Sequence, residues 1–179
     1  MLITRKSVGS FVNESGRFAI SDPCYEPDVW CRGELENIKA GTWNAEVGMT
    51  DAGSGWGVRV AMLIATHESC DEDAGIDLTE RRAEFEVGVD SGQAGIFDAK
   101  YYRDDSVFGV SEGDETGEVW YDHCCSATLS EARVGIIPFG VVSSSGYGDG
   151  GYECVYYTDA DNHVVKVVVQ FIYEETFND

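Results

Sequence analysis

The chain has 179 residues, of which 43% are hydrophobic and 12% aromatic, and this composition is typical of one folded domain rather than of a disordered segment. It carries 33 Asp and Glu against 12 Lys and Arg, for a formal net charge of -21. A surface this acidic repels phosphate backbones and anionic headgroups, so we expect no direct binding to nucleic acid or to membranes.

Residues 1–179 are expected to form a single globular domain in the cytoplasm, because no stretch has the apolar length of a signal peptide or of a membrane span. A reducing compartment disfavours structural disulfides. The cysteines are therefore expected to be free thiols: Cys24, Cys31, Cys70, Cys124, Cys125 and Cys154.

Apolar residues alternate with polar ones in short segments that are separated by Gly, Asp and Ser clusters, which is the pattern of antiparallel β-strands. In chain order, strands are predicted at 16–21, 41–49, 56–67, 83–90 and 117–122. Three further segments are rich in β-branched and aromatic residues and predict a three-stranded meander: 134–144, 151–158 and 163–173.

Helix is predicted in two short segments only. Residues 28–38 follow an Asp that can cap a helix, and residues 121–132 surround Cys124. The predicted fold class is therefore mainly β (β-rich α+β), an antiparallel twisted sheet or partly open barrel with one or two short helices.

Three blocks of the sequence share one pattern: "SDPCY" (21–25), "VDSGQAGIFD" (89–98) and "SSSGYGDGGY" (143–152). Each borders a predicted strand and has an Asp at the bend, with glycines nearby in the second and third. In this order the blocks resemble an uncharacterised family of small bacterial and phage proteins, over most of the chain. The resemblance implies no settled activity. It implies a bacterial or mobile-element context, and it marks Asp22, Cys24, Asp90, Gln93, Asp98 and Asp149 for testing.

Two interpretations of these bends remain open. If they meet at one rim of a sheet, Asp22, Asp90, Asp98 and Asp149 form a pocket for a hard cation or for general acid–base chemistry. The structural interpretation, which we favour, is that turn carboxylates accept nearby backbone N–H groups. Ser91 and Gln93 are interpreted in the same two ways, as ligand contacts or as partners of buried carbonyl groups.

Other catalytic and metal motifs are weak. Cys24 with His67 is one possible nucleophile–base pair. Zinc would have to use short spacings such as His67 with Cys70, or His123 with one of the two cysteines that follow it. An EF-hand loop that begins at Asp159 would lack the glycine at its sixth position and would have Gln170 where the glutamate belongs, and no Gly-rich segment has the Lys of a P-loop. We predict no metal and no cofactor.

The functional prediction comes from charge. Two acidic loops are expected to supply an interaction surface: Glu68, Asp71, Glu72, Asp73, Glu112, Asp114, Glu115 and Glu118. DNA presents one charge about every 1.7 Å of its axis, and surface carboxylates can present a comparable field to a basic groove. Together with the phage resemblance, this predicts an inhibitor of a nucleic-acid-binding defence enzyme, for example an anti-CRISPR protein in the DNA channel of a Cas effector. The alternatives are a small hydrolase with an Asp-rich site, metal-assisted or not, and a small-ligand binding module.

Overall fold

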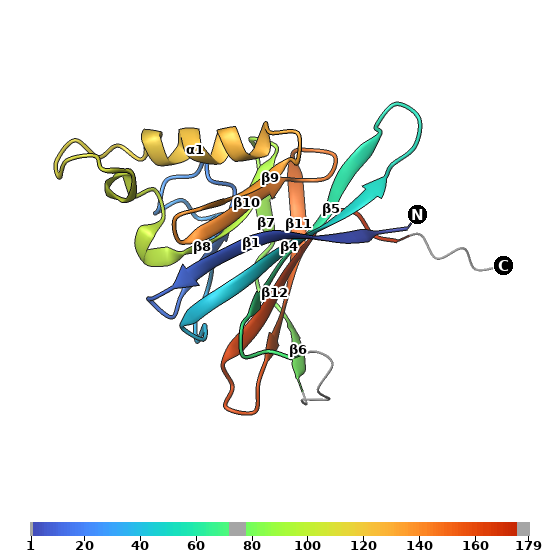
Figure 1. The fold of residues 1–179 in the computed structure, drawn as a ribbon, viewed down its shortest axis with the longest axis horizontal. Helices are drawn as coiled ribbons and strands as arrows, with labels where there is room; N and C mark the ends of the chain where they lie inside the picture. Colours follow the sequence, from blue (N-terminus) through green and yellow to red (C-terminus); the bar gives the residue numbers. More distant parts are fainter. Residues whose placement is uncertain (1, 72–77, 175–179) are drawn as a thin grey trace.

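Two antiparallel sheets and one α-helix form the part of the chain that the computed structural model describes, residues 2–71 and 78–174 (Figure 1). The larger sheet contains, side by side, β1 (Thr4–Asn13), β4 (Gly41–Asp51), β5 (Val58–His67), β12 (Val164–Gln170), β11 (Gly150–Thr158) and β6 (Thr79–Arg82), with β7 (Val87–Val89) also paired to β11. The smaller sheet contains β3 (Gly33–Leu35), β2 (Phe18–Ser21), β8 (Gln93–Asp98), β10 (Gly140–Ser144) and β9 (Val134–Ile137). The predicted mainly β fold with a short helix is confirmed.

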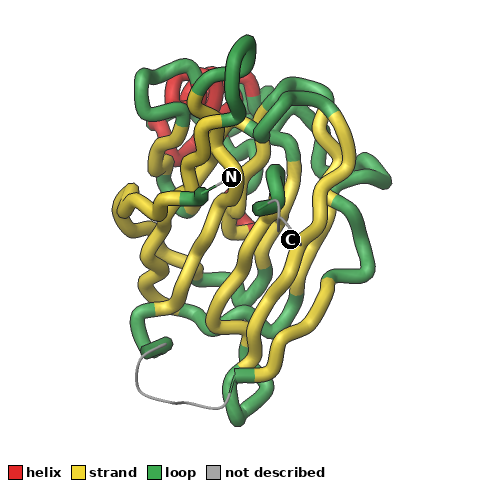
Figure 2. The backbone as a smooth tube through the Cα atoms, turned by 90° about the vertical axis from the view of Figure 1, so that its right-hand side faces the viewer, coloured by secondary structure: helices red, strands yellow, loops and turns green. Residues whose placement is uncertain are grey.

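The smaller sheet is covered on both faces. Its strand β8 is buried at every residue: Ile96 belongs to the core that the two sheets share, whereas Phe97 packs against Trp120 of α1 (Glu118–Thr128). Figure 1 shows α1 lying across this sheet. By contrast, β4 of the larger sheet alternates, with Trp43 and Ala45 buried and Asn44 between them exposed, as expected for a sheet with one face toward water. Figure 2 shows the long strands of the larger sheet running side by side with a marked twist.

The 3₁₀ helices η2 (Ala99–Tyr101) and η3 (Asp105–Phe108) connect β8 toward α1. Asp105 is buried, and its carboxylate accepts the backbone N–H groups of Thr116, Gly117 and Trp120 at 3.0, 2.8 and 2.8 Å. These donors would otherwise be unpaired at the start of α1, so Asp105 sets where the helix begins. The predicted strand at 117–122 is therefore wrong, and the predicted helix at 121–132 overlaps the observed one.

The predicted helix at 28–38 is also wrong. The chain makes turns there and then forms β3, whose Gly33 pairs with Ile20 of β2. A Cβ atom at Gly33 would lie 2.2 Å from Cε2 of Phe85, so the strand fits beside that ring only because residue 33 has no side chain.

The C-terminal segments do not form the predicted three-stranded meander. Residues 150–158 and 164–170 pair as the hairpin β11–β12 in the larger sheet, as expected. Residues 134–144 form a separate hairpin, β9–β10, in the smaller sheet, and it turns at Pro138 and Phe139, where Phe139 has φ +63°. Strands β1 and β6 were not predicted.

Candidate functional site

Asp22 connects the first two sequence blocks, 21–25 and 89–98, which were predicted to meet at one rim of a sheet. It follows β2 directly, is fully buried, and accepts four hydrogen bonds on its carboxylate. The backbone N–H groups of Cys24, Asp90 and Ser91 donate at 2.9, 2.9 and 2.6 Å, and the Ser91 hydroxyl donates at 2.6 Å. Each oxygen accepts two of these bonds, so the carboxylate ties the turn between β7 and β8 to the end of β2. Asp22 has the role that the structural interpretation predicts.

The third block lies beside the second at the same end of the sheets. Ser145 donates its N–H to the carbonyl oxygen of Gly92 at 3.1 Å, and Gly150 pairs with Val89. Asp149 therefore lies near this turn, and its side chain is exposed to solvent. In residues 2–71 and 78–174, no hydrogen bond or ion pair involves the Asp149 carboxylate.

Asp90 is exposed at the same rim and has a different partner. The Tyr25 hydroxyl donates to Asp90 Oδ2 at 2.7 Å. Burial and this hydrogen bond raise the pKa of Tyr25 above its ordinary value. Tyr102 stabilises the loop that carries Tyr25, because its hydroxyl donates to the carbonyl oxygens of Asp22 and Tyr25 at 3.0 and 2.8 Å. The rim is thus a well-connected set of turns.

Asp98 does not join this rim. It lies at the other end of β8, five residues from Gln93, which is about 17 Å along a strand. Its buried carboxylate accepts the backbone N–H groups of Glu14, Ser15 and Lys100 at 2.7, 3.2 and 3.0 Å, and it also accepts the Ser15 hydroxyl. Asp98 therefore fixes the β1–β2 turn, and four aspartates do not converge on one pocket.

Gln93 connects the rim to α1. Its side chain is buried and its Nε2 donates to Sγ of Cys125 at 3.4 Å, while its Oε1 accepts the Thr128 hydroxyl at 3.1 Å. Both ends of the amide are thus paired with side chains of the helix, so this residue contributes to packing rather than to an open binding surface.

Cys24 is half-buried and poorly suited to nucleophilic chemistry. Burial, together with a hydrogen bond to Asp22 and the charge of that carboxylate, raises its pKa from 9.0 to about 12. Its possible base, His67, has other partners: Nδ1 lies 2.8 Å from the Ser69 hydroxyl and Nε2 lies 2.9 Å from the carbonyl oxygen of Ala40. The Cys24–His67 pair is therefore not formed. All six cysteines are free thiols, as predicted.

The predicted acidic residues fall into two separate groups. Glu68 and Asp71 are exposed in the segment that follows β5. Glu72 and Asp73 lie outside the described residues. Glu112, Asp114, Glu115 and Glu118 are all exposed, in the loop before α1 and in its first turn.

The second group is larger than predicted. Asp122 is exposed one helical turn after Glu118, so both carboxylates lie on one face of α1. We call this group the α1 acidic surface: Glu112, Asp114, Glu115, Glu118 and Asp122. The segment 104–132 contains eight Asp and Glu residues and no Lys or Arg. That count was available in the sequence and is the signal that could have identified the surface.

One further group has metal-ligand atoms close together. Side-chain atoms of Asp159, Asp161 and His163 lie within 4.8 Å of one another in the turn between β11 and β12. Asp159 already accepts the backbone N–H groups of Asp161 and His163, each at 3.0 Å, and it forms an ion pair with Lys39 at 3.3 Å. The arrangement is that of a turn closed by an aspartate.

Comparisons with protein-family models, with curated proteins and with solved structures found no match to this chain. The resemblance of the three sequence blocks to a bacterial and phage family thus stays a prediction. In residues 2–71 and 78–174, no helix combines the length and the apolar character that crossing a bilayer requires.

Proposed function

We propose that this chain is a cytoplasmic binding protein of a bacterium or mobile element that presents the α1 acidic surface to a basic partner. The partner would be a nucleic-acid-binding defence enzyme such as a Cas effector, and the chain would inhibit it by occupying the groove that binds nucleic acid. The observation that carries the proposal is the exposed row of carboxylates on α1 and the loop before it, in a segment without Lys or Arg.

The spacing of these carboxylates suits a groove that binds phosphates. Glu118 and Asp122 are four residues apart on a helix, a rise of about 6 Å. Two steps of a B-DNA strand rise by about 7 Å. Because α1 packs on the smaller sheet through Trp120 and Cys124, its acidic face is held in a fixed orientation. A rigid surface loses less conformational entropy on binding than a flexible acidic tail would lose.

The geometry supports the hydrolase alternative less well. The Asp22 carboxylate is buried and already accepts four hydrogen bonds, Asp98 lies at the far end of β8, and the Cys24 thiol has a raised pKa. A catalytic carboxylate needs a free oxygen within reach of substrate. Asp90 and Asp149 remain exposed at the rim, and they are the residues through which that alternative would have to act.

The test is a pull-down from bacterial lysate at low and high salt, followed by mass spectrometry of the retained proteins. The surface variant combines Glu112→Gln, Asp114→Asn, Glu115→Gln, Glu118→Gln and Asp122→Asn. The matched control neutralises five exposed carboxylates elsewhere: Asp28→Asn, Glu36→Gln, Glu84→Gln, Glu86→Gln and Asp161→Asn. Both variants lose the same number of charges, so they separate the local surface from the net charge.

We expect wild type and control to retain a nucleic-acid enzyme that about 0.5 M salt or duplex DNA releases, because exposed charge pairs are screened at that ionic strength. The surface variant should retain at least ten times less. Equal loss in both variants, or retention that DNA does not compete, would refute mimicry by this surface. No retention at either salt would favour the hydrolase or ligand-binding alternative.

A further inference from the structure

The two sheets meet edge to edge along β1 and β9. In the described residues β1 pairs only with β4, and β9 pairs only with β10, so the two strands lie beside each other without a shared ladder. They are in close contact at Gly9, where β1 has a register shift and where a Cβ atom would lie 3.0 Å from Cγ1 of Ile136. Beside this contact, residues of both strands line a cavity.

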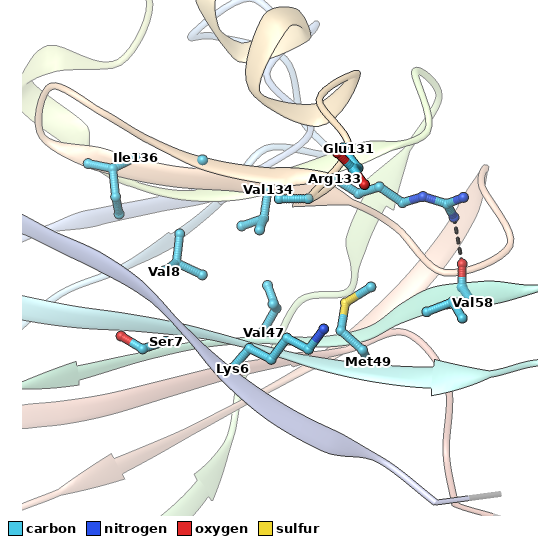
Figure 3. Close-up of a pocket in the computed structure, with 12 residues that line it drawn as sticks. Lys6, Ser7, Val8, Val47, Met49, Val58, Glu131, Arg133, Val134 and Ile136 are labelled. Atoms are coloured by element: carbon cyan, nitrogen blue, oxygen red, sulfur yellow. Dashed lines mark hydrogen bonds between the residues drawn. The ribbon is translucent and has the colours of Figure 1, made fainter.

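This cavity has a volume of about 490 Å³, which is within the range of small-ligand sites. Val47 and Val134, two residues of the main core, line it together with the half-buried side chains of Val8, Met49 and Ile136 (Figure 3). An apolar molecule placed there would therefore contact aliphatic groups on both the β1–β4 side and the β9 side.

Two cations, one on each side, also line the cavity. Figure 3 shows Lys6 extended along the β1 side and Arg133 reaching from the segment before β9 toward Val58, to whose carbonyl oxygen its Nη1 donates at 2.7 Å. A guanidinium has five N–H donors, so Arg133 retains others for a ligand. Glu131 is the third charged residue of the lining.

Lys6 and Arg133 are among the cations for which the described residues give no carboxylate partner. In residues 2–71 and 78–174, at least seven of the chain's 12 Lys and Arg residues form ion pairs with carboxylates, namely Arg5, Arg17, Arg32, Lys39, Arg82, Lys100 and Arg103. Within 2–71 and 78–174, neither Lys6 nor Arg133 forms an ion pair, although carboxylates are abundant elsewhere on the surface. The lining therefore combines aliphatic side chains with two positive charges. Within the described residues, neither of these charges forms an ion pair with a carboxylate.

We propose that this cavity binds a small amphiphile with an aliphatic body and a single carboxylate as its head group. The body would lie on Val8, Val47 and Met49, and Lys6 and Arg133 would hold the carboxylate by charge-assisted hydrogen bonds. Glu131 disfavours a head group with more than one negative charge. The site is separate from the α1 acidic surface, so it does not depend on the function proposed above.

The test is calorimetric titration with octanoate, with 1-octanol as the uncharged probe of the same length. The variant Lys6→Met removes a cavity cation, and Lys100→Met is the matched control because Lys100 is exposed and lies 3.9 Å from Glu14 at a different surface. Wild type should bind octanoate at least tenfold more tightly than octanol. Lys6→Met should weaken octanoate binding at least fivefold and leave octanol binding unchanged, while Lys100→Met should change neither.

A cavity-filling variant, Val8→Trp, checks the position of the site. It should abolish binding of both probes while its circular dichroism remains that of wild type; if this variant fails to fold, the Lys6→Met and Lys100→Met comparison decides. The proposal is overturned if wild type does not bind octanoate, if octanol binds as tightly as octanoate, or if Lys6→Met and Lys100→Met weaken octanoate equally. It is also overturned if folded Val8→Trp binds octanoate like wild type.

Discussion

Replacing Asp22 by Asn tests whether the rim is held together by one carboxylate. The amide nitrogen cannot accept hydrogen bonds, so two of the four bonds to Asp22 are lost, and the donors that made them are left facing an NH₂ group at a part-buried site. Hydrogen bonds to charged groups each contribute about 1.5–3 kcal/mol to stability. The expected loss in the free energy of unfolding is therefore about 3 kcal/mol or more, a large part of the roughly 5–15 kcal/mol typical of a domain.

Urea denaturation followed by circular dichroism measures this loss. With an m-value of about 2 kcal/mol/M, the midpoint for Asp22→Asn should fall by about 1.5 M. Asp149→Asn is the matched control, because it removes the same charge from the same rim but from an exposed side chain, and it should change stability by less than about 0.5 kcal/mol. A midpoint for Asp22→Asn within about 0.3 M of wild type would show that the charge of Asp22 and the two lost bonds add no net stability.

Three further variants or reagents test other parts of the structure. Burial opposes ionisation of Asp105, but the N–H groups of Trp120, Thr116 and Gly117 outweigh this effect and hold the pKa of Asp105 below 3.8. The ionised carboxylate therefore stabilises the fold fully above about pH 4, and this stabilisation is lost as the pH falls through the lowered pKa. The unfolding free energy measured by urea denaturation should fall less between pH 7 and pH 3 in Asp105→Asn than in wild type. Gly33→Ala places a Cβ atom 2.2 Å from Phe85 and should cost about 1–3 kcal/mol by calorimetry, and adding Phe85→Leu should recover part of that loss. Iodoacetamide at pH 8 should modify Cys24, whose pKa is raised to about 12, at least about tenfold more slowly in the folded chain than in urea, as measured by peptide mass spectrometry.

Each of these expectations has a contradicting result. An identical pH dependence in Asp105→Asn would mean that the carboxylate has no role in stabilising α1. If Phe85→Leu recovered nothing, the cost of Gly33→Ala would have a cause other than the ring. Equal alkylation rates in folded and unfolded chain would show that the Cys24 thiol is not protected by its surroundings.

The strands were predictable where their residues alternate between buried and exposed positions. Segments 41–49 and 56–67 were expected as strands and form most of β4 and β5, because one face of the larger sheet packs on the core. The helix was ambiguous for a physical reason. Residues 117–122 contain a β-branched and two aromatic residues, which favour a strand, and what starts α1 there is the carboxylate of Asp105, which lies more than ten residues upstream. Local patterns do not contain that interaction.

The candidate site was predictable in part. The sequence pattern placed Asp22, Asp90 and Asp149 at strand ends, and the fold brings them to one end of the sheets. Asp98 was grouped with them because it belongs to the same sequence block as Asp90, but β8 is long enough to place it at the opposite end. The cavity could not be predicted, since it depends on which strand of one sheet lies beside which strand of the other.

The meeting of β1 and β9 also bears on self-association. Exposed strand edges are templates for edge-to-edge aggregation, and proteins protect them by covering, shortening or charging them. Here the edge strand β1 lies against β9, β3 and β7 have three residues each, and the edge strand β6 has the sequence Thr-Glu-Arg-Arg with every side chain exposed. In the described part of the chain, the strand edges are therefore short, charged or covered, which are the features that disfavour recruitment of further copies into a continuous sheet.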